Sequence, residues 1–140
     1  MNYKRAAVIH SLFAATTLLA TAAPVLDIQT IAGKAPADVS KVLGEPAQPE
    51  KTKYGSKLSY KDGKIEVVFI NGKADWITIS GMGGVPFDAN AIEALGLKPQ
   101  PPTFKSAFVI RWEPHAIYNS VSVFALNGKV DYAYIKVATK

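Results

Sequence analysis

Cysteine is absent from this chain of 140 residues. Its absence excludes disulfide bonds, thiolate metal sites, cysteine nucleophiles and a lipid-modified N-terminal cysteine. The fold must therefore depend on a hydrophobic core, which a chain of this length is large enough to form.

Histidine is scarce, with two residues, His10 and His115. We expect His115 to lie in a surface loop because it follows Pro114. Together with Glu113 it would offer a metal ion only two ligands, whereas protein zinc sites use three or four. The sequence therefore predicts no metal site and no cofactor.

Catalytic motifs are also missing, and we do not expect an enzyme. The glycine-rich stretch at 81–84 lacks the Gly-Lys-Ser/Thr ending of a nucleotide-binding loop, and we interpret it as a flexible joint. Asp75 and Asp131 occupy similar sequence contexts. They are either a symmetric acidic pair or two residues that accept hydrogen bonds from their own turns. Catalysis would require these aspartates to converge with Glu66 or His115.

What the chain does contain is an internal repeat. The sequence NGKADWITI at 71–79 returns as NGKVDYAYI at 127–135. Upstream, LGEP at 43–46 has a looser counterpart in LGLKP at 95–99. The alternative is a chance match, since Asn-Gly hairpins are common. The repeated order of helix end, strand and turn favours two copies of one structural unit.

Each copy is expected to contain one helix followed by three strands. The first helix begins at Pro36, because proline suits the first helical position, and ends at Gly44. The second begins after Asp88, which can accept hydrogen bonds from free backbone N–H groups, and ends at Gly96. Hydrophobic patterns between turn signals predict strands at 57–60, 65–70, 74–79, 107–112, 121–126 and 130–137.

A unit of about 45 residues buries too little surface to be stable alone, so the two copies should share one core. The simplest arrangement is an α+β fold in which two tandem α-β-β-β repeats, at about 27–80 and 86–137, form one antiparallel sheet. That sheet would have about six strands, with the helices on one face. The other face would be open to solvent or to a partner.

The N-terminus resembles a secretory signal peptide. Residues 1–22 contain the cationic Lys4 and Arg5, then an apolar stretch, then an Ala-Thr-Ala cleavage site. The alternative, a membrane anchor, needs about 20 apolar residues, and this stretch is shorter and interrupted by His10. We therefore expect cleavage after the signal, a single domain at 23–140, a periplasmic or secreted location and no stable membrane insertion.

The charge pattern argues against a nucleic-acid partner. Removal of Lys4 and Arg5 lowers the formal net charge from +5 to +3, and the remaining lysines are scattered rather than clustered. Arg111 is then the only arginine. An open sheet edge could pair with a foreign strand or with a second copy of the chain, so a homodimer is one possible assembly.

Aromatic residues indicate a binding surface. Alternation in the last strand of each copy puts Trp76 on one side, and Tyr132 and Tyr134 on the matching side, opposite the aliphatic residues. Tyr60 and Trp112 are further candidates for this face. Exposed Trp and Tyr side chains carry much of the binding energy at protein interfaces. The alternative is that these rings pack on each other across strands and bind nothing.

The tandem pattern, with a first helix ending in Val-Leu-Gly-Glu-Pro at 42–46, resembles the β-lactamase-inhibitor-protein-like fold, which includes the SmpA/OmlA-type envelope proteins. The resemblance covers most of residues 30–137 and implies a binding role through an aromatic-rich sheet face. Two features depart from it: the lipidated cysteine of the SmpA/OmlA type and the disulfides of the inhibitors are missing. The positions that correspond to the binding face are Trp76, Tyr132, Tyr134, Tyr60 and Trp112.

These observations predict an exported, non-catalytic binding domain that contacts another envelope or secreted protein through its open sheet face. The alternative is a periplasmic protein that binds a small molecule or a cell-wall fragment. Its ligand would lie in a cleft between the two copies, near residues 81–84.

Overall fold

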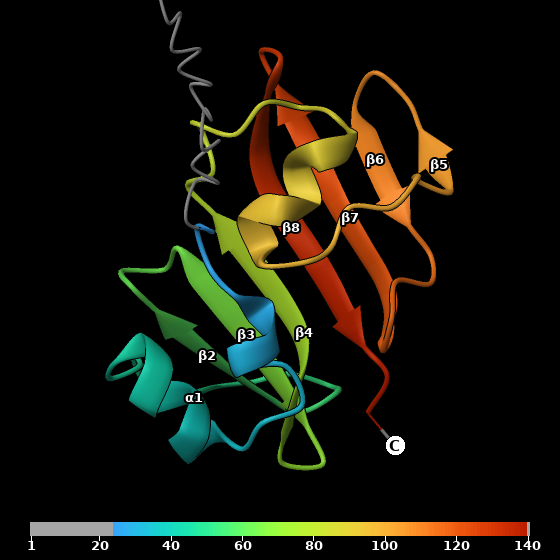
Figure 1. Cartoon of the computed structure of the whole chain (residues 1–140). Helices are drawn as coiled ribbons and strands as arrows, with labels where there is room; N and C mark the ends of the chain where they lie inside the picture. The colour runs from blue at the N-terminus through green and yellow to red at the C-terminus, as the bar shows by residue number, and fades with distance from the viewer. Residues whose placement is uncertain (1–23, 140) are drawn as a thin grey trace, which may run out of the picture.

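The computed structural model describes residues 24–139, so the predicted signal peptide at 1–22 lies outside the described residues. The fold is α+β and contains one antiparallel sheet in the order β1-β2-β3-β4-β8-β7-β6-β5 (Figure 1). The helical elements are η1 (Ile28–Thr30), α1 (Pro36–Leu43) and η2 (Ala89–Leu95). The strands are β1 (Glu50–Lys51), β2 (Ser56–Tyr60), β3 (Ile65–Ile70), β4 (Lys73–Ser80), β5 (Phe104–Lys105), β6 (Val109–Trp112), β7 (Tyr118–Leu126) and β8 (Lys129–Val137).

The expected α+β class with one antiparallel sheet is confirmed, but the expected count of about six strands is not, because the described part of the chain forms eight. The two additional strands, β1 and β5, have two residues each and lie at the two edges of the sheet. Strands this short have no alternating hydrophobic pattern, so no sequence signal marked them. Such short edges, with Lys51 and Lys105 on them, limit pairing with another chain.

Two hairpins with Asn-Gly turns join β3 to β4 and β7 to β8. The φ angles are +51° and +73° at Asn71-Gly72, and +51° and +74° at Asn127-Gly128. Positive φ at both central residues is what these two-residue turns require. The register shifts once in the β3–β4 hairpin and twice in the β7–β8 hairpin, and the residue left without a direct partner near each Asn-Gly turn is Asp75 in β4 and Asp131 in β8. Both aspartates therefore occupy β-bulges.

The two predicted helices occur where the sequence places them. Helix α1 begins at Pro36 and ends before Gly44, whose φ is +89°. Element η2 follows Asp88, whose carboxylate accepts a hydrogen bond from the backbone N–H of Asn90 at 2.8 Å, and it ends before Gly96. It is a 3-10 helix rather than an α-helix.

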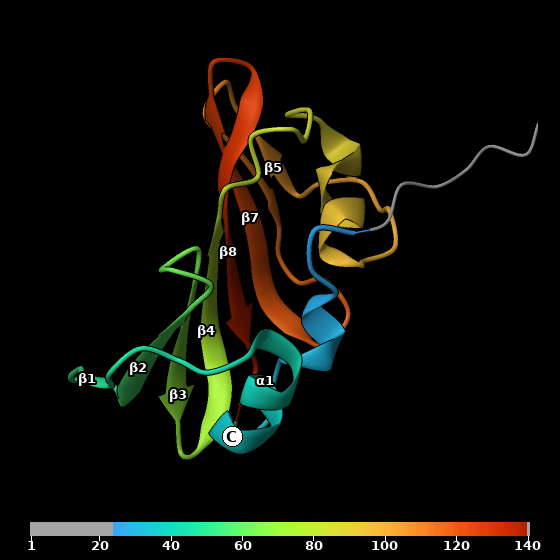
Figure 2. The same ribbon diagram turned by 90° about the vertical axis from the view of Figure 1, so that its left-hand side faces the viewer.

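The helical elements lie on one side of the sheet (Figure 2). The core lies between them and that face of the sheet, and the central pair β4–β8 contributes Ile77 opposite Ile135. The other face has no described helix over it, and we call it the uncovered face. No helix formed by residues 24–139 has the length and hydrophobicity that crossing a membrane requires.

Candidate functional site

Three of the five expected binding residues lie together on the uncovered face. Trp76 of β4 and Tyr132 and Tyr134 of β8 are half-buried and alternate with core residues of the same strands. In the β4–β8 register, Thr78 lies opposite Tyr134 and Ser80 lies opposite Tyr132. The two tyrosines therefore project from the same face as Trp76, beside the side chains of β4.

Tyr60 and Trp112 lie on the opposite face, and their assignment to the binding surface is wrong. Tyr60 is 1% exposed and Trp112 is 0% exposed, which removes both from any surface that a partner can reach. They follow the buried Leu58 and Ile110 by two positions, so strand alternation turns them toward the core. The indole N–H of Trp112 donates to the carbonyl oxygen of Gln100 at 2.9 Å.

Aromatic rings cross the uncovered face from the turn before β2 to strand β7. The ring centroids of Tyr54 and Trp76 are 4.8 Å apart, and those of Trp76 and Tyr134 are 6.4 Å apart. The rings of Phe124 and Tyr132 stack at 4.5 Å with an interplanar angle of 12°. These are distances at which rings attract each other. We call these five side chains the aromatic strip.

The turn between β1 and β2 holds Tyr54 in place. The hydroxyl oxygen of Thr52 accepts hydrogen bonds from the backbone N–H groups of Tyr54 at 3.2 Å and Gly55 at 3.1 Å. Gly55 packs so closely on β3 that a Cβ atom there would lie 2.0 Å from the carbonyl oxygen of Phe69. The close contact fixes the turn on the sheet and directs the Tyr54 ring onto Trp76.

A buried carboxylate lies beside Trp76. Asp75 is 1% exposed and accepts hydrogen bonds from the ammonium group of Lys136 and the hydroxyl group of Thr139. Lys136 stands opposite Trp76, and its ammonium nitrogen is 5.6 Å from the centroid of the indole. The expectation that Asp75 bonds to its own turn is therefore wrong, because its position in the bulge brings it to Lys136 instead.

The residues that catalysis would need do not come together. Asp131 is exposed and lies toward the opposite end of the β4–β8 pair from Asp75. Glu66 lies on the uncovered face, where it pairs with a lysine of β2. His115, expected in a surface loop, is instead 4% exposed, and its Nε2 atom is 3.0 Å from the carbonyl oxygen of Lys98.

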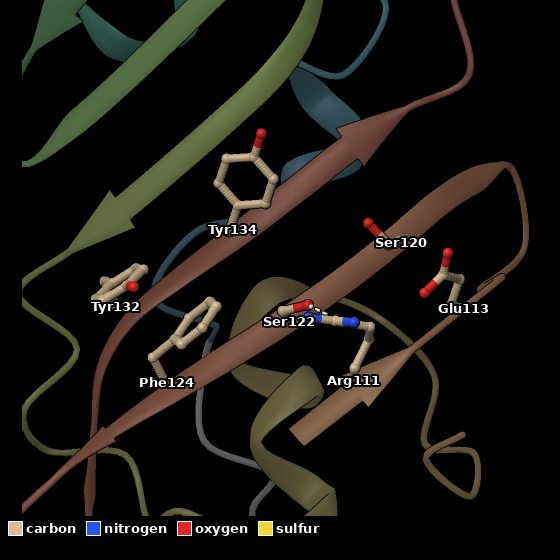
Figure 3. Close-up of a pocket in the computed structure, with 7 residues that line it drawn as sticks. All are labelled: Arg111, Glu113, Ser120, Ser122, Phe124, Tyr132 and Tyr134. Carbon is tan, nitrogen blue, oxygen red and sulfur yellow. Dashed lines mark hydrogen bonds between the residues drawn. The ribbon is translucent and has the colours of Figure 1, made fainter. Parts of the chain in front are cut away.

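A shallow hollow of about 410 Å³ lies next to the aromatic strip (Figure 3). The side-chain Nε–H of Arg111 donates to the hydroxyl oxygen of Ser122 at 3.1 Å, and Ser122 is 3% exposed. Arg111 is thereby held along the sheet rather than extended into solvent. The lining residues are Arg111, Glu113, Ser120, Ser122, Phe124, Tyr132 and Tyr134.

The surroundings raise the pKa of two ionisable groups on the uncovered face. Burial raises the pKa of the Tyr134 hydroxyl, and the charge of Asp75 and the nearby Tyr54 act in the same direction. Tyr134 therefore remains a neutral donor and acceptor at physiological pH. Hydrogen bonds to Glu50 and Glu66 raise the pKa of the Lys57 ammonium group, so this lysine stays charged.

Sequence reasoning missed Tyr54 and Phe124 and gave Arg111 no role. Tyr54 lies in a turn, where no periodic pattern applies. Phe124 and Arg111 could have been found by alternation, since Phe124 is out of phase with the buried Val123 and Arg111 is out of phase with the buried Trp112. Phe124 was missed because an apolar side chain is more readily assigned to a core.

A separate cavity of about 370 Å³ lies near residues 81–84, where a cleft between the copies was expected. No ring of the aromatic strip lines it. Its lining residues, mostly apolar, are Val25, Gly81, Met82, Gly84, Val85, Pro86, Glu93 and Ala94.

Among residues 24–139, no three histidine, aspartate or glutamate side chains are grouped so that they could hold a metal ion. Comparison of the chain with protein-family models, with curated proteins and with solved structures gave no match. The inference of function therefore starts from the aromatic strip and the hollow on the uncovered face.

Proposed function

We propose that the chain is an exported, non-catalytic binding domain that contacts another envelope or secreted protein through its uncovered face. The aromatic strip carries this proposal, because its five rings, packed in one group of three and one stacked pair, lie on a face without a described helix over it. Trp and Tyr side chains offer large rigid apolar areas together with a hydrogen-bonding group, which makes them frequent anchors of protein interfaces.

Packing of the rings on each other also stabilises the sheet, but part of the aromatic surface remains exposed to solvent. Tyr54 is 48% exposed. Phe104 of β5, which faces Arg111 across the β5–β6 pair, is 51% exposed. A face that keeps this much aromatic surface accessible beside half-buried rings favours a partner over packing alone.

Contact through the face, rather than through an edge, is favoured by the strand lengths. Both edges of the sheet are strands of two residues, which offer few free backbone groups for strand addition. A second copy of the chain would therefore also bind through the face. Export, and with it a periplasmic or secreted location, is inferred from the sequence at 1–22.

We also infer that the sheet consists of two tandem copies of one unit. The strand order is symmetric about the β4–β8 pair. The Asn-Gly turns at Asn71 and Asn127 have nearly identical φ angles, and each is followed by a bulge at an aspartate, Asp75 or Asp131. Shared turns and shared bulges at aligned positions support duplication more strongly than the sequence match does.

The test is affinity capture from envelope extract with residues 23–140 as bait. The Trp76→Ala, Tyr132→Ala double variant removes two rings of the aromatic strip. The matched control is Phe108→Ala, which removes a ring that is 76% exposed in the turn between β5 and β6. Circular dichroism checks that each variant is folded.

The proposal expects one protein that binds the wild type and the Phe108→Ala control and is lost with the double variant. Direct titration of the purified partner then confirms the loss of affinity. Equal binding to all three proteins, or the absence of any specific partner, would overturn the assignment of the face.

The second candidate function is binding of a small molecule or a cell-wall fragment. The observation that favours it is the apolar cavity of about 370 Å³ near residues 81–84. It is tested by screening small-molecule and cell-wall-fragment libraries against the wild type and a Met82→Gln variant, since Met82 lines this cavity and is 1% exposed. A ligand whose binding does not depend on Met82 would count against this site.

A further inference from the structure

Lys57 and Lys136, two cationic residues of the uncovered face, are ion-paired. The ammonium nitrogen of Lys57 is 2.9 Å from a carboxylate oxygen of Glu50 and 3.4 Å from one of Glu66. Lys136 is paired with the buried Asp75. Arg111 has no ion-pair partner among residues 24–139. Its guanidinium group lines the hollow and is therefore free to pair with an anion.

The geometry of Arg111 suits the recognition of an anion. Its Nε–H is engaged by Ser122 at 3.1 Å, and Ser122 is almost fully buried, so the side chain is anchored on the sheet. This hydrogen bond uses one of the five N–H groups of the guanidinium. The terminal N–H groups form a rigid fork that matches the two oxygens of a carboxylate.

The other residues of the hollow indicate which chemical group could lie next to the bound anion. Ser120 contributes a hydroxyl group, and the stacked rings of Phe124 and Tyr132 form an apolar wall beside Arg111 (Figure 3). A fitting group therefore combines a carboxylate with an adjacent apolar or aromatic side chain. Glu113 also lines the hollow, and its negative charge opposes the incoming anion.

We propose that the partner of the uncovered face places an acidic side chain on Arg111 and an aromatic or apolar side chain against the Phe124–Tyr132 stack. This inference rests on the proposed function and specifies the chemistry of the partner. In the first half of the sheet, the aligned position is Ser59, which faces Glu66 across β2 and β3. Only the second half offers the carboxylate site, so the site also sets the orientation in which the partner docks.

The direct test uses nuclear magnetic resonance, because Arg111 is the only arginine in residues 23–140 and its side chain gives one Nε–H signal. The probes are hydrocinnamate, a carboxylate next to a phenyl ring, and hydrocinnamide, its uncharged amide. We expect hydrocinnamate to shift the Arg111 signal saturably at about millimolar concentration, as for other fragments of this size. Hydrocinnamide and sodium chloride of the same ionic strength should leave it in place.

Two variants, followed through the backbone amide of Phe124, extend the test. Arg111→Lys keeps the charge but loses the fork, and we expect hydrocinnamate to bind about tenfold more weakly. Glu113→Gln removes the opposing charge and should strengthen binding about twofold or more. Equal binding of the acid and the amide, or unchanged affinity in Arg111→Lys, would overturn the proposed carboxylate site.

Capture experiments separate this inference from the proposed function. A partner that requires Trp76 and Tyr132 and is also lost with Arg111→Gln supports both. A partner that requires the two rings but binds Arg111→Gln normally leaves the binding face in place and overturns the acidic contact. If the wild type captures no partner, the proposed function fails, the acidic contact of a protein partner fails with it, and the hydrocinnamate titration alone decides whether Arg111 binds carboxylates.

Discussion

Lys136 and Trp76 face each other across β8 and β4, with the ammonium nitrogen 5.6 Å from the centroid of the indole ring. The same ammonium group donates to Asp75, which is 1% exposed. One lysine therefore neutralises a buried carboxylate and also lies over a ring of the aromatic strip. The position of Trp76 is thereby linked to an ion pair at a β-bulge, so stability and the shape of the candidate site are coupled here.

Replacement of Lys136 by Met should lower the free energy of unfolding by about 3 kcal/mol, because it leaves Asp75 buried without its cation. The Lys136 side chain is 29% exposed, which places the loss at the lower end of the range for buried pairs. Urea denaturation measures the difference. The Asp75→Asn, Lys136→Met double variant is the control and should recover a large part of the loss. Equal stability of the single and double variants would show that the uncompensated charge is not the cause.

Truncation of the two tryptophans should affect stability and binding differently. Trp112→Ala removes a fully buried ring and should destabilise the fold by about 3–5 kcal/mol, without acting on binding in whatever fraction stays folded. Trp76→Ala removes a half-buried ring of the uncovered face and should lower stability by about 1 kcal/mol while it weakens binding. Denaturation curves and titration with the captured partner measure the two effects. Similar losses of stability in both variants would contradict the placement of Trp112 in the core and Trp76 on the surface.

Alkaline titration should reveal two late-ionising tyrosines. Burial raises the pKa of Tyr134, as it does that of Tyr118, where the charge of Asp27 adds to the effect. The folded state keeps these protons at a pH at which the unfolded chain loses them. Their contribution to stability is therefore complete below the unfolded pKa of about 10 and is lost as pH rises through the folded pKa.

The absorbance of tyrosinate against pH measures this titration. Tyr134→Phe and Tyr118→Phe should each remove part of the late component and make stability less dependent on pH above about 10. A late component that survives in both single variants without loss of amplitude would contradict the burial of these hydroxyl groups.

Gly55 should not tolerate a side chain. A Cβ atom there would lie 2.0 Å from the carbonyl oxygen of Phe69, so Gly55→Ala must displace the turn that carries Tyr54. We expect a loss of about 1–3 kcal/mol in unfolding free energy and a change in the fluorescence of Trp76, which contacts Tyr54. Gly84→Ala is the matched control, because no atom would lie within 4 Å of its Cβ, and it should change stability by less than about 0.5 kcal/mol. Comparable effects of the two substitutions would rule out steric contact as the cause.

Much of the fold could be predicted because its signals are local. The Asn-Gly dipeptides at 71–72 and 127–128 tolerate the positive φ that two-residue hairpin turns require, and the structure has hairpin turns at both places. Pro36 and Gly44 bound α1, and Asp88 and Gly96 bound η2, as backbone hydrogen-bonding rules predict. The edge strands β1 and β5 could not be predicted, since two residues cannot show a period.

The candidate site could be predicted only in part. Alternation placed Trp76, Tyr132 and Tyr134 on one side of their strands, and that relation is local. Tyr60 and Trp112 were misplaced because the aromatic character of a residue does not say which side of its strand the helices cover. That choice depends on how distant segments pack.

By itself, the sequence determined the elements, their turns and the alternation within each strand, because these depend on hydrogen bonds and side-chain spacing between near neighbours. The tertiary structure alone decided which aromatic rings meet, that Asp75 pairs with Lys136, and that Arg111 is anchored by Ser122 beside the Phe124–Tyr132 stack. These contacts join residues on different strands. Their geometry follows from the register of the sheet and from bulges that shift it, which no local pattern specifies.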